Sequence, residues 1–464
     1  MSTPVERLSR DERVQRGKAA RTALPLDALA DTGPTDGRPD PLDLLEQQAT
    51  IRVPELIPLR YGRMSDSAFA FYRGSALVMA HDLATTPDTG LRVQLCGDAH
   101  LSNFGVFGSP ERRLLFDLND FDETLPGPFE WDVKRLLASV ELAGRANDFS
   151  RKERRQAVLG AARAYREAVR EFAGQASLAV WYAHASVDDM IDELLTSLPG
   201  RSVRRTRATI SKARSSDHLK AVGKLTELVD GRRRFVADPP LLVPLRDLMD
   251  ENHAALRFHD LLVAYRTSLQ DDRRHLLEQY RLVDMARKVV GVGSVGTRAW
   301  VILLQGTDEN DLIVLQAKEA QASVLEEFAG ASDYGNHAQR VVEGQRLMQA
   351  ASDIFLGWQR VTGVDDVERD FYVRQLRDWK GSLPVEEAIP AGMARYAELC
   401  GWSLARAHSR SGDRVAIAAY LGSSERADEA LTEYAVGYAD RIEGDHTRLV
   451  EAIDSGRLPA TKGV

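Results

Sequence analysis

The chain has 464 residues, which is too long for one ordinary core, so we expect two or three lobes. A hydrophobic content of 44% with 28% charged residues is typical of a soluble globular protein. The chain carries 69 acidic and 61 basic residues, and this acidic balance argues against nucleic acid as a partner.

The cysteine content and the hydropathy of the chain further restrict the class of protein. Cys96 and Cys400 are the two cysteines, and their wide separation argues against a disulfide framework and against a Cys-based zinc site. The N-terminal residues lack the apolar core of a signal peptide, and no apolar run is long enough to span a membrane. We therefore expect a cytoplasmic protein without a membrane partner.

The first 53 residues are predicted to form a charged arm followed by a proline-rich extended loop. The next segment, 54–76, places Arg60, Arg63 and Arg73 among aromatic side chains. Such arginines either cover a core with their aliphatic stems or bind phosphate and substrate oxygens. The sequence leaves both interpretations open.

An oxygen-rich stretch follows, with the sequence L-C-G-D-A-H-L-S-N-F-G-V-F and then, after a short gap, L-L-F-D-L-N-D-F-D-E. We expect two short apolar strands with polar ends, and these oxygen donors suit Mg²⁺. Asp98 and Asn103 have the spacing of the catalytic Asp and the metal-binding Asn in the H-R-D-x-x-x-x-N loop of kinases. Asp117 follows at the end of a strand, where kinases keep a second metal-binding Asp.

Helices are predicted next. Leu136, Leu137 and Val140 recur at helical spacing after Asp132, which can cap this helix or brace the loop behind it. Further helices are expected over 151–195 and again up to about residue 281. The basic stretch between them, 201–235, forms a solvated face or attracts an anionic substrate.

Gly291, Gly293 and Gly296 form the pattern G-x-G-x-x-G, and the run T-R-A-W-V-I-L-L after them predicts a strand. Glycines of a dinucleotide-binding fold open a helix instead. A glycine loop between two strands is typical of kinases, where it closes over the ATP phosphates. Lys318 lies near the end of the next predicted strand, 312–320, where a lysine can pair with the α- and β-phosphates.

A helix after this strand is expected to supply a glutamate that holds Lys318. Glu343, within R-V-V-E-G-Q, is the first candidate and Glu326 the second. A further strand is expected over 370–376, and its part near Tyr372–Arg374 would border the adenine. Helices are expected over 393–408 and in the last fifty residues.

The sequences G-D-A-H-L-S-N-F, F-D-L-N-D-F-D-E and G-P-F-E-W-D-V-K-R-L resemble the catalytic core of aminoglycoside phosphotransferases and choline kinases. From P-L-R-Y-G-R-M to its end, the chain also resembles the bacterial family called domain of unknown function 2252, which is placed by similarity with protein-kinase-like folds. The resemblance implies that Asp98 is the catalytic Asp and that Asn103 and Asp117 bind the metal. The chain departs from the pattern at Cys96, which replaces a His, and at Asp120, an added carboxylate that can share or take over the metal role.

The order of the motifs also departs from kinases, because the loop near residue 98 precedes the glycine loop near residue 291. We therefore expect an α+β, protein-kinase-like two-lobed fold with circularly permuted lobe order and a large helical lobe. The helix that ends L-A-R-A-H resembles the helix before the catalytic loop of those phosphotransferases. The predicted parts are an arm and loop (1–53), the catalytic-loop part of the helical lobe (54–284), a β-rich nucleotide-binding lobe (285–380) and helices that complete the helical lobe (381–464).

Together these motifs predict an ATP- and Mg-dependent phosphotransferase that acts on a hydroxyl of a small molecule or a protein. Asp98 would accept or orient the acceptor proton. Mg²⁺ would be held by Asn103, Asp117 and Asp120, and ATP by the glycine loop, Lys318 and Glu343. The basic segments suggest an anionic acceptor. The sequence does not identify this acceptor or the oligomeric state, and it does not distinguish transfer of a phosphoryl group from transfer of a nucleotidyl group.

Two other functions fit parts of the sequence. Asp98 and His100 form a D-x-H pair, which together with His337 in G-N-H would suit a two-metal, metallophosphoesterase-like hydrolase. Such a hydrolase has no use for Lys318 or the glycine loop. A nucleotide-binding pseudokinase is the third interpretation, against which the intact polar residues argue.

Overall fold

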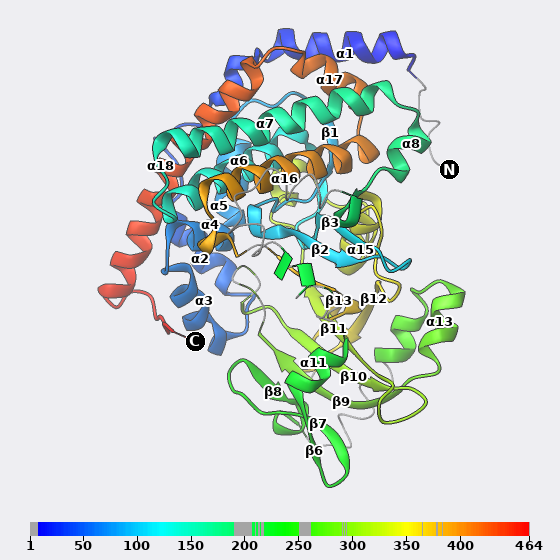
Figure 1. Ribbon diagram of the computed structural model, residues 1–464. Coiled ribbons are helices and arrows are strands. Elements are labelled where there is room, and N and C mark those ends of the chain that lie inside the picture. The colour runs from blue at the N-terminus through cyan, green and yellow to red at the C-terminus, as the bar shows by residue number, and fades with distance from the viewer. Residues whose placement is uncertain are drawn as a thin grey trace.

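The computed structural model describes residues 8–189, 218–249, 261–289, 295–363, 365–376, 379–382 and 384–463, together with 207, 208, 210, 211, 214, 291 and 293. Within these residues the protein has a mixed α+β fold, which confirms the predicted class. A helical part and a part built on an antiparallel sheet lie one above the other in Figure 1.

The helical part is built from segments at both ends of the chain. Its helices are α1 (Arg10–Ala23), α2 (Pro41–Ala49), α3 (Ile57–Met64), α4 (Ala68–Gly74), α5 (Ala76–Ala84), α6 (Phe129–Ala146), α7 (Arg151–Gly174), α8 (Ser177–Tyr182), α16 (Pro390–Ser411), α17 (Arg414–Leu421) and α18 (Arg426–Asp454). The largest hydrophobic core lies among them. In Figure 1, α1 in blue lies beside α17 in orange, so the two ends of the chain meet in this part.

The central helix α6 is buried on almost every side. Its apolar residues recur at helical spacing, as predicted, and its buried charged residues are paired or hydrogen-bonded. The long helix α7 begins at a capping box in which Ser150 and Glu153 satisfy each other's backbone N–H groups. These helices form the rigid base on which the polar loops described below rest.

The sheet part contains six antiparallel strands in the order β12-β13-β11-β10-β9-β8. The strands are β8 (Leu242–Pro244), β9 (Arg281–Lys288), β10 (Ala299–Gln305), β11 (Leu312–Ala320), β12 (Gly357–Thr362) and β13 (Glu368–Gln375). Successive side chains alternate between two apolar clusters: Ile302 packs on one face, and Val301 and Leu303 pack on the other. Both faces are therefore covered, by α13 (Asp271–Leu277), α15 (His337–Met348) and α11 (His218–Leu225) among others.

Short strands carry the polar loops between the two parts. One pair joins β1 (Arg92–Leu95) to β4 (Leu125–Pro128), and a second sheet joins β2 (Phe104–Gly108), β3 (Leu114–Leu118) and β5 (Ala185–Ser186). The remaining elements are the hairpin of β6 (Thr226–Val229) with β7 (Arg232–Phe235) and the short helix α14 (Glu326–Ala329). The oxygen-rich stretch thus lies in the turns between strands, as predicted.

Most predicted elements are present, including the strands over 312–320 and 370–376 and the helix over 393–408. Three predictions needed correction. Part of the basic stretch is the hairpin β6–β7 rather than helix and loop, and the helical region before residue 281 contains the strand β8. Part of the proline-rich loop is helical, because Asp40 caps α2 with Pro41 at its first position. The predictions for residues 190–206 and 250–260 lie outside the described residues.

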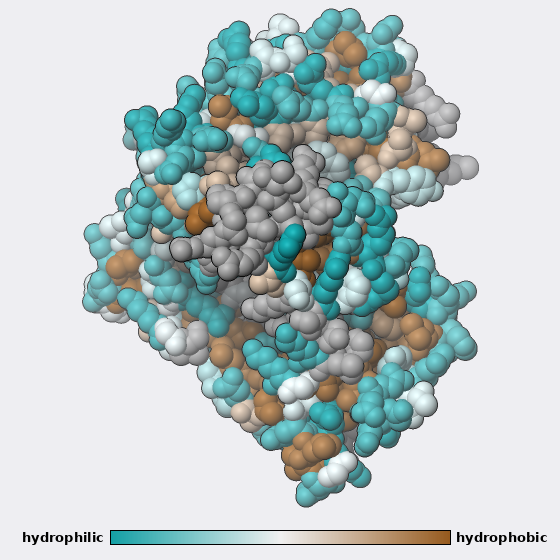
Figure 2. Space-filling model, viewed as in Figure 1, coloured by the Kyte–Doolittle hydropathy of each residue, from teal (hydrophilic) through white to brown (hydrophobic). Residues whose placement is uncertain are grey.

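The surface offers no broad apolar face in the view of Figure 2, where apolar side chains are scattered among polar ones. One small group lies at the tip of the hairpin β6–β7, where Leu228 and Val229 are exposed. Among the helices of the described residues, none combines the length and the apolar character needed to cross a membrane.

The crossing of α16 over α7 requires glycine at position 401. A Cβ atom there would lie 2.4 Å from the carbonyl oxygen of Ala161 on α7. We expect Gly401→Ala to lower the free energy of unfolding by about 1–3 kcal/mol, because the helices must move apart. Urea denaturation measures this change. Gly392→Ala on the same helix is the matched control, because a Cβ atom there would lie 3.6 Å from Ile389. This substitution should raise the free energy of unfolding by up to about 1 kcal/mol. Equal effects at both positions would contradict the close approach.

Candidate active site

A cleft of about 1120 Å³ lies between the N-terminal helices, the polar loops and the sheet part. Stretches from across the chain line it: 47–77, 98–123, 291–327 and 374–386. Among the predicted site residues, Asp98, Asn103, Asp120, Gly291 and Gly293 line the cleft. The polar motifs of the sequence therefore meet in one place, although nearly 200 residues separate the two groups.

The loop before Asp98 is fixed by the helix α6. Asp132 in the first turn of α6 accepts hydrogen bonds from the backbone N–H groups of Cys96 and Gly97, at 2.6 and 3.0 Å. His408 of α16 lies 3.2 Å from the same carboxylate. Gly97 has φ +84°, and a Cβ there would be 2.3 Å from the carbonyl oxygen of Glu123. Of the two roles predicted for Asp132, the structure shows the bracing of this loop.

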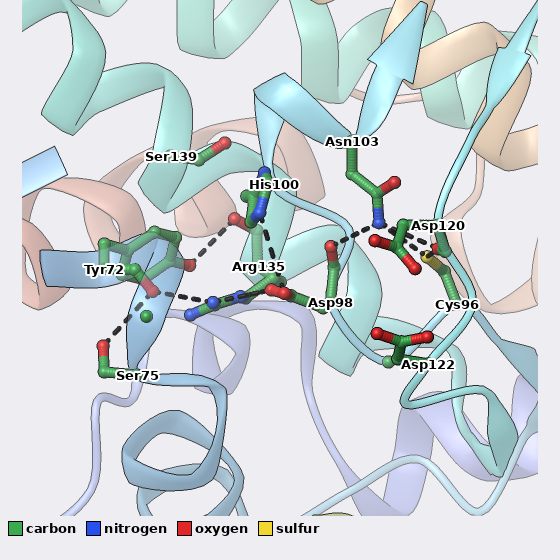
Figure 3. Close-up of polar contacts among 12 residues, drawn as sticks. Tyr72, Ser75, Cys96, Asp98, His100, Asn103, Asp120, Asp122, Arg135 and Ser139 are labelled. Carbon is green, nitrogen blue, oxygen red and sulfur yellow. Dashed lines mark hydrogen bonds and ion pairs between the residues drawn. The ribbon is translucent and has the colours of Figure 1, made fainter. Parts of the chain in front are cut away.

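Asp98 lines the cleft, and Figure 3 shows its carboxylate against Arg135 and near His100. Arg135 of α6 donates from Nε to its carboxylate at 2.8 Å, and its Nη2 lies 2.6 Å away. The Arg135 guanidinium is itself held, 3.9 Å from the centre of the Tyr72 ring. His100 Nε2 lies 3.6 Å from Asp98, and burial, with Arg73 and Arg135 nearby, lowers the pKa of His100 to about 4. His100 is therefore a neutral neighbour of Asp98 at neutral pH.

Asn103 ends the short 3₁₀ helix Leu101–Asn103 and is buried. Its amide nitrogen donates to the backbone carbonyls of Asp98 and Asp120, each at 2.9 Å, which ties the two loops together. Its side-chain oxygen has no hydrogen-bond partner among the described residues. A buried carbonyl oxygen without a donor beside it suits a bound cation.

Asp120 and Asp122 follow β3 and form an ion-pair cluster with Lys318 of β11. The Lys318 ammonium lies 3.3 Å from Asp120 and also contacts Asp122, which in turn accepts a hydrogen bond from Tyr372 at 2.7 Å. Burial by itself would lower the pKa of Lys318, but the two carboxylates raise it above its usual range. Burial raises the pKa of Asp120, and Lys318, Arg374 and Lys380 more than reverse this shift. Asp120 therefore stays ionised and faces the cleft, with its side chain 40% exposed.

The glycine loop joins β9 to β10 and lies against the N-terminal helices. Arg63 donates to the carbonyl oxygen of Gly291 at 2.6 Å, and Arg52 to that of Val295 at 2.6 Å. The backbone N–H of Val53 donates to Gly296, whose φ of +91° explains the glycine. Of the three arginines noted in segment 54–76, Arg63 thus anchors this loop, Arg73 lines the cleft and Arg60 is buried.

Asp117 does not face the cleft, although its spacing predicted a metal ligand. Its side chain is 1% exposed and accepts two hydrogen bonds from Arg406 of α16, at 2.6 and 2.7 Å, and another from the backbone N–H of Ala350. The alternation along β3 turns Asp117 toward the helices, and Asp120 lies beyond the end of the strand. Of the two candidate carboxylates, Asp120 is therefore the one that reaches the cleft.

The expected pair of Lys318 with Glu343 is not formed. Glu343 of α15 lies 3.1 Å from Arg346 on its own helix, and the reserve candidate Glu326 lies 3.7 Å from Arg340. The buried face of α15 carries Arg340, which donates to the carbonyl oxygens of Asp122, Thr124 and Gln321. The carboxylates that hold Lys318 come instead from the loop after β3.

Sequence reasoning missed two residues of this site, Arg135 and Lys380, and it placed Arg374 only on the strand expected to border the adenine. Arg135 lies one helical turn after Asp132, so the helical periodicity of α6 could have placed both on the face toward the loop. Arg374 and Lys380 line the cleft from the end of β13 and the segment after it. Their spacing follows no motif, and only the folded chain brings them to Asp120.

His337, which the hydrolase hypothesis requires, is not among the residues that line the cleft. It begins α15, where its backbone N–H donates to Asp370 at 2.8 Å, and Asn336 caps the same helix. The sequence G-N-H thus forms a helix start in this structure.

One protein-family model matches most of the chain. It is that of DUF2252, described as "Uncharacterized protein conserved in bacteria", and it matches residues 52–452. The expected resemblance to domain of unknown function 2252 is confirmed. No curated protein and no solved structure matches the chain significantly. The likeness to kinases and the circular permutation stay predictions.

The Asp117–Arg406 pair tests the division of roles between Asp117 and Asp120. Removing one member of a buried ion pair leaves the other charge buried without a partner, here that of Arg406. Asp117→Ala should therefore lower the free energy of unfolding by about 3–5 kcal/mol in urea denaturation. Glu398→Ala removes a half-exposed partner of Arg395 and should cost no more than about 1 kcal/mol. A small loss of stability for Asp117→Ala, together with a loss of Mg²⁺-dependent ligand binding, would restore Asp117 as a metal ligand.

Proposed function

The chain belongs to the DUF2252 family, and from the chemistry of its cleft we propose that it transfers a phosphoryl group from ATP to a hydroxyl with the help of Mg²⁺. The observation that supports this proposal is that Asp98, Asn103 and Asp120 line one cleft together with Gly291 and Gly293, while Lys318 is paired with Asp120. These residue types are the ones that kinases use for the acceptor, the metal and the phosphates.

The donor set fits Mg²⁺. Asp120 offers an ionised carboxylate and Asn103 an amide oxygen without a partner among the described residues. Within the described residues, no cluster of three or more His, Cys, Asp or Glu side chains could hold a metal ion by itself. This pattern suits Mg²⁺, which is commonly bound by one or two protein ligands together with phosphate oxygens and water. When bound, Mg²⁺ would neutralise charge on the β- and γ-phosphates.

The order of parts supports a kinase-like arrangement of the sheet. In kinases a glycine-rich loop precedes a lysine on the third strand, and a helix follows. Here the glycine loop joins β9 to β10, Lys318 lies on β11, and α15 follows β11 in the chain. Because the loop with Asp98 comes before these parts, such a fold would be circularly permuted.

Each of these side chains has a separate role in the proposed reaction. Asp98, which Arg135 holds in place through a direct ion pair, orients the acceptor hydroxyl and takes its proton late in the transfer. Lys318 is close enough to Asp120 to bind the same phosphate groups that a cation on Asp120 would touch. The glycine loop, fixed by its hydrogen bonds to Arg52 and Arg63, presents its backbone to the cleft without side chains in the way at Gly291 and Gly293.

Nucleotide binding is tested with the non-hydrolysable analogue AMP-PNP and Mg²⁺. At one hundred times its dissociation constant the analogue should stabilise the wild type by about 2.7 kcal/mol in thermal unfolding. Lys318→Met should weaken its binding about tenfold or more, because a charged contact to the phosphates is lost. Lys152→Met, which removes an exposed lysine on α7, should bind like the wild type. Each variant is compared with its own ligand-free melting temperature. A wild type that AMP-PNP does not stabilise would refute the proposal.

Turnover is tested by the Mg²⁺-dependent formation of ADP from ATP, first with water and then with a panel of hydroxyl compounds. Asp98→Asn should lower the rate about a hundredfold or more while AMP-PNP still binds. His337→Ala should leave the rate unchanged. Nucleotide binding without any ADP formation would identify a pseudokinase. Hydrolysis of p-nitrophenyl phosphate that depends on His337 would instead favour the hydrolase.

A further inference from the structure

We propose that Arg374 and Lys380 form a phosphate-binding subsite beside Asp120. Its ligand is a phosphate group, either of the nucleotide or of a phosphorylated acceptor, and the nucleotide source rests on the proposed function. Neither residue belongs to the motifs that suggested a phosphotransferase. The contacts around them carry the inference independently.

Arg374 is held rigidly at the edge of the cleft. It lies on β13, and its Nη1 donates to the backbone carbonyl of Asn119 at 2.9 Å, directly before Asp120. Its guanidinium lies 5.6 Å from the centre of the Tyr372 ring on the same strand. Its Nε is buried and has no hydrogen-bond partner among the described residues. Arg374 thus reaches the cleft with a fixed orientation and a donor to spare.

Lys380 reaches the same place from the segment after β13. The next residue, Gly381, exchanges two backbone hydrogen bonds with Val106 of β2, at 2.7 and 3.0 Å. These bonds attach the segment to the sheet that carries Asp120. Lys380 and Arg374 both lie close enough to Asp120 to act on its charge, as does Lys318.

Arg374 and Lys380 feel the charges of Asp120 and Asp353, which favour the charged forms of both groups, but within the described part of the chain neither group has a carboxylate in direct contact. Among the described residues, no carboxylate lies within 4.0 Å of the charged groups of Arg374 or Lys380, whereas Lys318 is paired with Asp120 and Asp122. Burial, together with Arg374 and Lys318, lowers the pKa of Lys380 to about 7. Cations crowded in a half-buried cleft are unfavourable unless an anion joins them. A guanidinium beside an ammonium suits the oxygens of a phosphate group.

The subsite is tested by calorimetry with two probes: inorganic phosphate alone, and AMP-PNP with Mg²⁺. The proteins are the wild type, Lys380→Met, Arg374→Met and the control Lys152→Met, at equal ionic strength. We expect inorganic phosphate to bind the wild type and the control equally and to bind each cleft variant about tenfold or more weakly. Circular dichroism confirms that each variant is folded.

The two probes separate the sources of the phosphate. Weaker binding of both probes in the cleft variants supports the subsite and assigns it to the nucleotide. Weaker binding of inorganic phosphate alone supports it and assigns it to a phosphorylated acceptor. If AMP-PNP does not bind the wild type while inorganic phosphate still depends on Lys380, the subsite stands and the proposed function fails. Phosphate binding that is absent, or equal in all four proteins, overturns the subsite.

Discussion

The ion-pair cluster of Lys318 with Asp120 and Asp122 is the contact on which the cleft depends. It joins β11 to the loop after β3 across 198 and 196 residues of sequence, and Tyr372 of β13 adds a hydrogen bond to Asp122. Arg340 of α15 holds the backbone of the same loop at the carbonyl oxygens of Asp122 and Thr124. Two strands and a helix of the sheet part therefore fix the loop that faces the helical part. The position of Asp120, and with it the shape of the cleft, follows from these contacts.

Helices and strands with a regular apolar pattern were predictable, because that pattern is contained in the local sequence of each element. The apolar run in β11 and the helical spacing in α6 identified these two elements. The β-branched run after the glycine loop placed that loop between strands. The two strands β12 and β8 were not predicted, since each is short and lies at an edge of the sheet. Helix α2 was also missed, because prolines before it suggested a loop although Pro41 fits the first helical position.

The site was predictable only where chemistry and spacing agreed. Asp98, Asn103 and Asp120 were all named, yet spacing could not separate Asp120 from Asp117, because the buried partner of Asp117 is Arg406, 289 residues away. The partner of Lys318 was sought on the following helix, whereas it comes from a loop far earlier in the chain. Lys380 gave no local signal, and nothing local assigned Arg135 and Arg374 to Asp98 and Asp120. Such residues acquire their role from the tertiary fold, which single-sequence patterns do not contain.

The attachment of the glycine loop to residues 52–63 has a consequence for the kinetics of ligand exchange. Hydrogen bonds from Arg52, Val53 and Arg63 hold three carbonyl groups of the loop, so these groups cannot leave residues 52–63 unless the bonds break. Opening requires either that all three bonds break together or that the N-terminal helices move with the loop. Both are collective motions, which are slower than the fluctuation of a single loop. A ligand beneath this loop would therefore have a long residence time, and its departure would be a candidate for the slow step of a catalytic cycle.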